Sequence, residues 1–245
     1  MYLYVYAGYG YNAGMDQHVR TFISALRSTI PVFFGYMSIG IAFGFLLVTS
    51  GVHWIWALII SVAVFAGAAQ FLAVGLISSG SSPVEIGIAV FLINARHMVY
   101  GLSLLERFQF FRRFKAYIIF GLTDETYGLL TTVEAPEGSD PEVFDFYITL
   151  LNHSYWILGS VSGALLGRVL PYDAPGIEFS MTALFTVLLI EQIKSIRKAA
   201  PFVLALGICI LLHLLQVREQ LLLPAIILSA LGTMALPADE NGGAS

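Results

Sequence analysis

Charged residues are scarce in this chain of 245 residues. Only 11% are charged, with 12 basic and 16 acidic side chains, whereas 58% are hydrophobic. An ordinary soluble domain has about 25% charged residues, which cover its surface. So few charges cannot form the polar shell of a soluble fold, and the mean hydropathy is +0.81. The composition excludes soluble, disordered and collagen-like proteins and predicts an all-α polytopic membrane protein.

Residues and motifs that many enzymes need are also missing. Cys209 is the only cysteine, so no intrachain disulfide can form. The sequence contains no HExxH zinc motif and no P-loop, and its few lysines lie at the ends of hydrophobic segments rather than at mid-membrane. No polar stretch is long enough to form a soluble domain. We therefore expect no enzymatic activity, no cofactor or metal, and no nucleic-acid partner.

Hydrophobic segments fill most of the chain. A helix that spans a bilayer uses about 20 residues. Eight segments approach this length: 30–48, 54–77, 84–105, 116–132, 143–170, 177–193, 199–215 and 221–236. We expect about seven of them, within a range of six to eight, to form transmembrane helices. Residues 21–236 would then form a single transmembrane domain between a Tyr/Gly-rich leader, 1–20, and an acidic tail, 237–245, both expected to be disordered.

Basic residues gather in three clusters, at 20–27, 107–115 and 194–198, and acidic residues gather at 134–145. The positive-inside tendency predicts that all three basic clusters are cytoplasmic and that the acidic loop is outside. However, three hydrophobic segments separate each cluster from the next, and an odd number of full crossings cannot join points on one side. Either one cluster departs from the rule, or one segment in each trio is broken or re-entrant.

Two segments carry glycines at helical spacing. These small-xxx-small patterns allow close packing of helices, and their glycines are Gly40, Gly44, Gly159, Gly163 and Gly167. Each pattern is followed by two further apolar segments. One interpretation is a duplicated three-segment unit, and the other is ordinary glycine-mediated packing within a membrane bundle.

The third segment contains Asn94, Arg96 and His97 about halfway along its length. An ionisable group at membrane depth costs at least a few kcal/mol. On a helix, Asn94 and His97 share a face, while Arg96 points nearly the opposite way. Arg96 then requires a buried anion, either from the protein or from a substrate, and a purely structural ion pair is the alternative.

The fourth segment contains Asp124 and Glu125, which point about 100° apart on a helix. One carboxylate can pair while the other faces a cavity, and either is a natural partner for Arg96. Either can also carry a proton, because burial favours the neutral carboxyl. The alternative is a helix end at the interface, with Thr123 and Asp124 as caps.

The second segment contains the small-residue run Phe65-Ala-Gly67-Ala-Ala-Gln70-Phe71. Such a run predicts close helix contact or a local break. The Gln70 amide can bind the amine or the carboxylate of a substrate. A hydrogen bond between helices is the alternative.

Together these motifs resemble those of the AzlC-type permeases, the large subunit of branched-chain amino acid exporters. The most specific pieces are Asn94-Ala-Arg96-His97 and Thr123-Asp124-Glu125. The remaining matches, in the order of the family, are Pro31 with Gly35-Tyr36, Gly40-Ile-Ala-Phe-Gly44, the run 65–71, Tyr155-Trp156 with Gly159 and Gly163, and the run 176–180. The resemblance covers about residues 27–194, and the Tyr-rich leader does not match.

The resemblance implies a multi-pass protein of the cell membrane that exports leucine, isoleucine and valine. It also implies a small AzlD-type membrane subunit as partner and transport driven by a gradient of protons or another ion. The predicted substrate and ion pathway consists of Gly67, Gln70, Asn94, Arg96, His97, Asp124 and Glu125. A non-transporting scaffold or sensor, in which Arg96 and Asp124 form only a structural pair, is the alternative.

In the transporter interpretation, Arg96 binds the substrate carboxylate or a fixed acid. Asp124 or Glu125 carries the coupling proton or neutralises the substrate amine. Neighbours with aromatic or thioether side chains would accept the aliphatic part of the substrate; they are Phe71, Phe91 and Met98.

Overall fold

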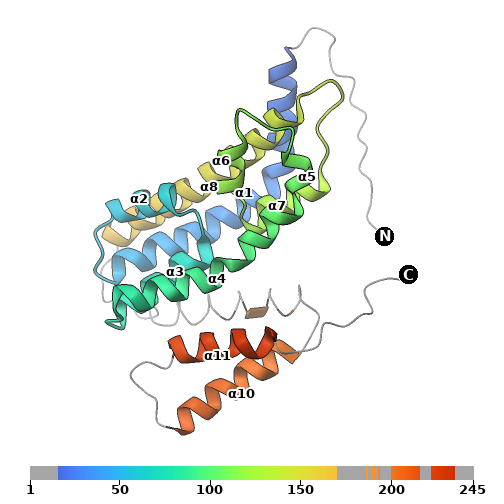
Figure 1. Ribbon diagram of the computed structural model, residues 1–245. Helices are drawn as coiled ribbons and strands as arrows, with labels where there is room; N and C mark the ends of the chain where they lie inside the picture. Colours follow the sequence, from blue (N-terminus) through green and yellow to red (C-terminus); the bar gives the residue numbers. More distant parts are fainter. Residues whose placement is uncertain are drawn as a thin grey trace. The chain divides into compact units, whose positions relative to one another are not determined.

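The computed structural model describes residues 16–169, 200–215 and 222–234, together with positions 186, 189, 190 and 193. Every regular element in these ranges is an α-helix (Figure 1), as predicted. In chain order they are α1 (Gln17–Thr49), α2 (Ile55–Ala63), α3 (Gly67–Ser78), α4 (Pro83–Ser103), α5 (Leu105–Phe108), α6 (Lys115–Phe120), α7 (Asp124–Thr132), α8 (Pro141–Val169), α10 (Ala200–Leu214) and α11 (Leu222–Met234). The predicted acidic tail and most of the segment 177–193 lie outside the described residues, and α1 already begins within the predicted leader.

The described residues form two compact units. Unit 1 contains the residues up to Tyr36 and Tyr100–Tyr155, and unit 2 contains Met37–Val99 and the described residues from Trp156 onward. The boundaries fall inside α1, α4 and α8, so each of these helices contributes to both units. Among the described residues, unit 1 contains the discontinuous helix α6–α7 and unit 2 contains the discontinuous helix α2–α3.

In unit 2, α1 and α8 pack against each other at their glycines. A Cβ atom on Gly40 would lie 3.0 Å from the backbone nitrogen of Ser160 and 3.1 Å from the Cα atom of Gly159. A Cβ atom on Gly44 would overlap the carbonyl oxygen of Ser160. Only glycine therefore allows the two backbones to approach this closely.

The same packing continues toward the C-terminal end of α8. A Cβ atom on Gly163 would overlap the carbonyl oxygen of Ile41. At Gly167 the added Cβ would lie 3.4 Å from the backbone oxygen of Phe45, which is ordinary van der Waals contact. The closest approach therefore lies around Gly44 and Gly163. The predicted duplication of the segments that follow these motifs extends into residues that the structure does not describe, and stays a prediction.

The predicted segment 54–77 is broken into α2 and α3 by residues 64–66. Phe65 has φ 41°, in the left-handed region that a bulky residue enters only under strain. Trp54, before α2, packs on the guanidinium of Arg168, 5.7 Å from the ring centroid. Gly67, at the start of α3, packs against the ring of Trp156. Arg168 and Trp156 are about 18 Å apart along α8, so α2 covers about half the thickness of a bilayer.

Figure 1 shows that α3 then runs back, so that the loop before α2 and the loop after α3 lie at the same end of unit 2. Neither half-helix has the length of a full crossing, since α2 has 9 residues and α3 has 12. The segment is therefore a hairpin of two half-helices with its break at residues 64–66.

The predicted segment 116–132 is likewise broken, into α6 and α7, by residues 121–123. Just before α6, the backbone N–H of Phe114 donates to the Glu142 carboxylate at 2.6 Å. Within α6, the hydroxyl of Tyr117 lies 2.8 Å from Nδ1 of His153. Because Glu142 and His153 both belong to α8, α6 runs along α8 from its first turn toward its middle.

The second half-helix of this segment, α7, runs back along α8. Near its start, the Asn152 amide donates to the hydroxyl of Thr126 at 3.1 Å. Near its end, the carbonyl of Leu130 accepts from Arg107, which is paired with Asp145. The contacts thus return from Asn152 to Asp145, and both ends of the segment lie beside the first turns of α8. The α6–α7 segment is re-entrant within unit 1.

This arrangement corrects the predicted topology. The sequence placed the basic cluster 107–115 in the cytoplasm and the acidic loop 134–145 outside. That prediction is wrong, because Arg107 is paired with Asp145 and the backbone N–H of Arg112 donates to Glu142 at 3.0 Å. The physical reason is that α6–α7 does not cross fully, so the chain returns to the end from which it started.

An apolar core holds the unit 1 hairpin. It joins buried side chains from α1, α6, α7, α8 and the region around α5. Its members are Ala25, Leu104, Phe108, Phe111, Ile118, Leu122, Leu130, Phe144 and Ile148. Burial of side chains from both half-helices fixes the hairpin against α1 and α8 through apolar packing and dispersion contacts.

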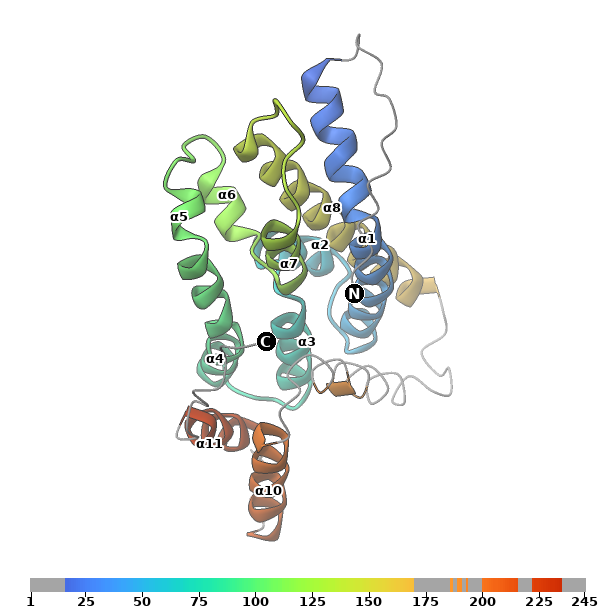
Figure 2. The same ribbon diagram turned by 90° about the vertical axis from the view of Figure 1, so that its right-hand side faces the viewer.

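Among the described residues, α1 and α4 are the two helices that are both long and apolar enough to cross a membrane. Further along the chain, α10 and α11 pack against each other (Figures 1 and 2), with Leu204 in contact with Gly232. The predicted count of about seven spanning helices therefore stays a prediction.

Candidate functional site

In unit 1, the break before α7 brings polar side chains together within an apolar segment. Thr123 is the N-cap of α7, and its hydroxyl accepts a hydrogen bond from the backbone N–H of Thr126 at 3.2 Å. The hydroxyl of Tyr36, on α1, lies 2.6 Å from the Thr123 hydroxyl and donates to Oε2 of Glu125 at 2.7 Å. Of the two caps that the sequence offered as an alternative, Thr123 is present as the N-cap, while Asp124 and Glu125 occupy the first helical turn.

Asp124 has a tyrosine partner of its own. The hydroxyl of Tyr100, near the end of α4, donates to Oδ1 of Asp124 at 2.6 Å. The Tyr100 ring stacks on Tyr127, with 4.4 Å between centroids and 12° between planes. The Ser103 hydroxyl in turn donates to the Tyr127 hydroxyl at 3.1 Å. Each carboxylate in the first turn of α7 is therefore oriented by a hydrogen bond from a tyrosine hydroxyl on another helix.

The predicted site residues did not include Tyr36, Tyr100 or Asn152, which the structure adds to this cluster. Asn152 is fully buried, and its Oδ1 has no hydrogen-bond partner within the part of the chain that the structure describes. The signal for Asn152 was a polar residue inside the apolar segment 143–170. The position of Tyr36 depends on how α1 packs against α7, which has no local signature in the sequence.

In unit 2, Gln70 lies at the break before α3. Its Oε1 accepts hydrogen bonds from the indole N–H of Trp156 at 2.9 Å and from the backbone N–H of Ala66 at 3.2 Å. The hydrogen bond between helices that the sequence offered as an alternative is therefore present. Gln70 is only 2% exposed, and its Nε2 has no hydrogen-bond partner among the described residues.

Aromatic rings surround Gln70. Phe43 on α1 packs edge to face against Phe71, with 5.5 Å between centroids, and stacks on Trp156 at 5.9 Å. A Cβ atom on Gly67 would lie 3.1 Å from the Trp156 ring, so glycine lets the indole lie close to the start of α3. The structure thus brings together two predicted site residues, Gly67 and Gln70, and adds Trp156 to them.

The predicted residues of the third segment lie on α4. Asn94, Arg96 and His97 are half-buried and belong to unit 2, whereas Asp124 and Glu125 belong to unit 1. The roles of these residues stay predictions. Two residues expected to accept an aliphatic side chain are largely exposed: Phe91 at 64% and Met98 at 63%. Phe71, the third, is buried.

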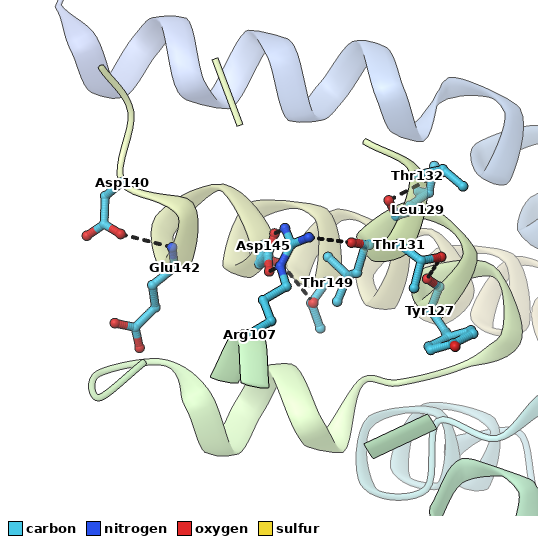
Figure 3. Close-up of polar contacts among 10 residues, drawn as sticks. Arg107, Tyr127, Leu129, Thr131, Thr132, Asp140, Glu142, Asp145 and Thr149 are labelled. Atoms are coloured by element: carbon cyan, nitrogen blue, oxygen red, sulfur yellow. Dashed lines mark hydrogen bonds and ion pairs between the residues drawn. The ribbon is translucent and has the colours of Figure 1, made fainter. Parts of the chain in front are cut away.

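A partly buried ion pair fixes the open end of the α6–α7 hairpin (Figure 3). Arg107 donates through Nε to Oδ2 of Asp145 at 2.8 Å and through Nη2 to Oδ1 at 2.6 Å. Its Nη1 donates to the carbonyl of Leu130 at 2.5 Å. The Asp145 side chain is fully buried. Because a bidentate pair is geometrically specific, this contact ties α7 to α8, and the sequence treated both residues only as loop charges.

The described residues contain no group of three or more His, Cys, Asp or Glu side chains placed to hold a metal ion. The polar side-chain groups at the two helix breaks are carboxylates, hydroxyls, amides and an indole N–H. The α7 break presents carboxylates, and the α3 break presents hydrogen-bond donors.

Comparisons with known proteins identify the family. The profile described as AzlC protein matches residues 31–170. An uncharacterized membrane protein of Helicobacter pylori (strain ATCC 700392 / 26695) is 39% identical over 220 residues, covering 90% of this chain and 96% of the relative. The branched-chain amino acid transport protein AzlC of Bacillus subtilis (strain 168) is 34% identical over 215 residues, covering 88% and 84%.

The inner membrane protein YgaZ of Escherichia coli (strain K12) is 29% identical over 181 residues, covering 71% of this chain and 74% of the relative. No solved structure matches the chain. The relatives are named as membrane or transport proteins, in agreement with the apolar composition. The family match covers more than half of the sequence and contains both helix breaks, so this membrane protein belongs to the AzlC family.

Proposed function

We propose that this protein is a permease that exports branched-chain amino acids by gradient-driven secondary transport. The observation that carries the proposal is the pair of discontinuous helices, each with polar side chains at its break inside an otherwise apolar segment. Secondary transporters place substrate and ion sites at breaks of this kind, where helix ends and freed backbone groups supply polar contacts. The name of the Bacillus subtilis relative supports the class of substrate.

Within this proposal, the α7 break receives positive charge. Asp124 and Glu125 either neutralise the substrate amine or carry the coupling proton. Tyr36 and Tyr100 orient the two carboxylates through hydrogen bonds of 2.7 and 2.6 Å. Arg96 binds the substrate carboxylate or a fixed acid, and Asn94 and His97 lie on the same helix.

The resemblance to the exporter family further supports a small AzlD-type membrane subunit as partner and a bundle of about seven spanning helices. The exposed apolar side chains of α4 suit contact with lipid or with such a subunit. They include Phe91, Met98, Val99 and Leu102, each more than half exposed.

The test is an efflux assay. Proteoliposomes that contain the chain and its small companion are loaded with labelled leucine, a proton gradient is imposed, and the loss of label is measured. We expect gradient-dependent efflux, which Asp124→Asn or Arg96→Gln abolishes without loss of folded protein. The matched control is Glu134→Gln, because Glu134 is an exposed loop carboxylate.

Two outcomes would contradict the proposal. Absence of gradient-dependent flux for leucine, isoleucine and valine would rule out the export function. Normal efflux by both the Asp124 and the Arg96 variants would instead show that the assignment of these residues to the transport pathway is wrong.

A further inference from the structure

The N-terminus of α3 is open. Its N-cap residue, Ala66, has no side-chain oxygen and makes no capping hydrogen bond. The first N–H groups of a helix have no partner within the helix. Within the described chain, the N–H groups of Gly67, Ala68 and Ala69 make no hydrogen bond, and the first turn contains no acidic residue. These donors lie at the positive end of the helix dipole.

Gln70 adds a second, independent donor at the same place. Both neighbours of its Oε1, the indole of Trp156 and the N–H of Ala66, are hydrogen-bond donors, so the amide cannot be flipped without opposing two donors. The NH2 group is therefore held in a fixed orientation. It is buried and has no hydrogen-bond partner among the described residues. An unpaired buried donor of this kind is costly to a fold unless a ligand satisfies it.

We propose that the break between α2 and α3 binds the carboxylate of the transported amino acid, through Nε2 of Gln70 and the free N–H groups at the start of α3. The inference rests on the proposed function and adds to it the part of the substrate that this site recognises; of the two roles proposed for Arg96, it leaves pairing with a fixed acid. The groups that Gln70 and the first turn of α3 present are donors, which suit an anion and cannot accept from an ammonium group. The surrounding rings of Phe43, Phe71 and Trp156 exclude water, which strengthens such hydrogen bonds.

Trp156 is a positioning residue in this site. Its indole N–H fixes the orientation of the Gln70 amide, and its ring packs against Gly67, so it sets both the donor and the helix start. A larger residue than glycine at position 67 would push the ring away. The site is therefore built from one turn of α3 and one residue of α8.

The test compares leucine with leucinamide, which lacks the negative charge. Equilibrium binding of both is measured for the detergent-purified full chain with its small companion, as wild type and as Gln70→Glu. The substitution keeps an acceptor for Trp156 and Ala66 but replaces the free NH2 group with an oxygen. We expect the Kd of leucine to rise about tenfold or more, while any affinity for leucinamide stays within about twofold of wild type.

A second variant keeps the inference testable if Gln70→Glu does not fold. Trp156→Phe retains a ring against Gly67 but removes the N–H that orients the amide. We expect a rise of about threefold in the Kd of leucine and none for leucinamide. Melting curves of each variant report whether the protein is folded.

The outcomes separate the two proposals. If wild type neither binds nor exports leucine, the proposed function fails. If wild type exports leucine but its affinity is unchanged in the folded variants, or if leucinamide weakens as much as leucine, the carboxylate site is overturned while the proposed function stands. If leucinamide does not bind to wild type at all, the test rests on leucine alone, and a rise in the Kd of leucine in the folded variants supports the inference whereas an unchanged Kd overturns it.

Discussion

The two discontinuous helices share a backbone plan but differ at the start of the second half-helix. α7 begins at Thr123, whose hydroxyl caps the helix, and carries Asp124 and Glu125 in its first turn. α3 begins at Ala66, which provides no cap, and has no acid in its first turn. Both helix starts lie within apolar segments of the sequence. A break of the same kind in the backbone therefore produces two helix N-termini that differ in charge: the α7 start carries carboxylates, and the α3 start carries none.

The difference shows how a few residues decide which charge a helix start accepts. The positive end of a helix dipole favours anions. In α7 the protein's own carboxylates occupy this position, so the remaining attraction is for protons and ammonium groups. The first turn of α3 contains no carboxylate, and Nε2 of Gln70 has no hydrogen-bond partner among the described residues, so an external anion can bind there.

The two hairpins also differ in the contacts that fix them to the neighbouring helices. The bidentate pair of Arg107 and Asp145 ties α6–α7 at its open end (Figure 3). In unit 2, glycine packing between α1 and α8 sets the surface that carries Trp156, against which α3 begins. Substitutions can break each form of support separately.

The largest effect is expected for Gly163→Ala, which removes the support on the α3 side. The added methyl would overlap the carbonyl of Ile41, so α1 and α8 must separate. We expect a loss of more than about 3 kcal/mol in the free energy of unfolding, because the contact is with rigid backbone. Thermal stability in detergent, followed by size-exclusion chromatography, measures it. The control is Gly75→Ala in α3, where an added Cβ meets nothing within 4 Å; equal stability of the two variants would contradict the packing role.

Removal of the ion pair in Arg107→Met is expected to have the next largest effect. Asp145 would keep a fully buried carboxylate without its partner. We expect a loss of about 2 kcal/mol, less than for a fully buried pair because the Arg107 side chain is 30% exposed. The change in melting temperature tests this. Arg112→Met is the matched control, since the Arg112 side chain is exposed, and a melting temperature as low as that of Arg107→Met would refute the specific role of the pair.

Thr123→Val removes the cap of α7 while keeping the shape of the side chain. The backbone N–H of Thr126 and the Tyr36 hydroxyl lose a partner. We expect a destabilisation of about 1 kcal/mol. Thr132→Val, at the exposed end of the same helix (Figure 3), should leave the melting temperature nearly unchanged. An unchanged melting temperature in Thr123→Val would mean that the cap does not stabilise α7 and so does not distinguish α7 from α3.

The smallest effect is a pH dependence at Glu142, outside the apolar segments. Slight burial favours its neutral form, but hydrogen bonds from the backbone N–H groups of Phe114, Arg112, Arg113 and Lys115 outweigh this and lower the pKa of Glu142 below its ordinary value. A carboxyl with a lowered folded pKa stabilises the fold above its unfolded pKa and loses this contribution as the pH falls through the folded value.

We therefore expect the melting temperature of wild type to fall as the pH drops below about 4.5, and Glu142→Gln to remove part of this fall. A series of melting curves between neutral and acidic pH measures the effect. Glu137→Gln, which changes an exposed carboxylate in the loop before α8, should keep the wild-type profile. Identical profiles for Glu142→Gln and wild type would rule out the contribution.

The sequence predicted the all-helical membrane class and the polar residues at both breaks. Small residues around Gly67 and the acids beside Thr123 are local signals, which composition and spacing can reveal. The sequence also offered broken or re-entrant helices as one explanation of its charge pattern. The sequence did not predict that α6–α7 returns to the first turns of α8, because the length of an apolar segment does not distinguish a full crossing from a hairpin.

The contacts that the sequence missed all depend on tertiary packing. Arg107 meets Asp145 across 38 positions of sequence, and the positive-inside tendency assigned them to opposite sides. Tyr36 reaches Thr123 only because α1 packs beside α7. The orientation of the Gln70 amide required Trp156, which lies on a helix far along the chain. The residue types showed which polar side chains are costly to bury in an apolar segment, but only the fold showed which residues they contact.

The difference between the starts of α3 and α7 predicts that the uncapped N–H groups of α3 bind a ligand. Ala66→Ser tests this most directly, because a serine hydroxyl at the N-cap can accept from the free N–H groups of α3. We predict an unchanged or higher melting temperature together with a rise of several-fold in the Kd of leucine, whereas Ala63→Ser, at the end of α2, changes neither. Unchanged leucine affinity in a stable Ala66→Ser protein would contradict the account.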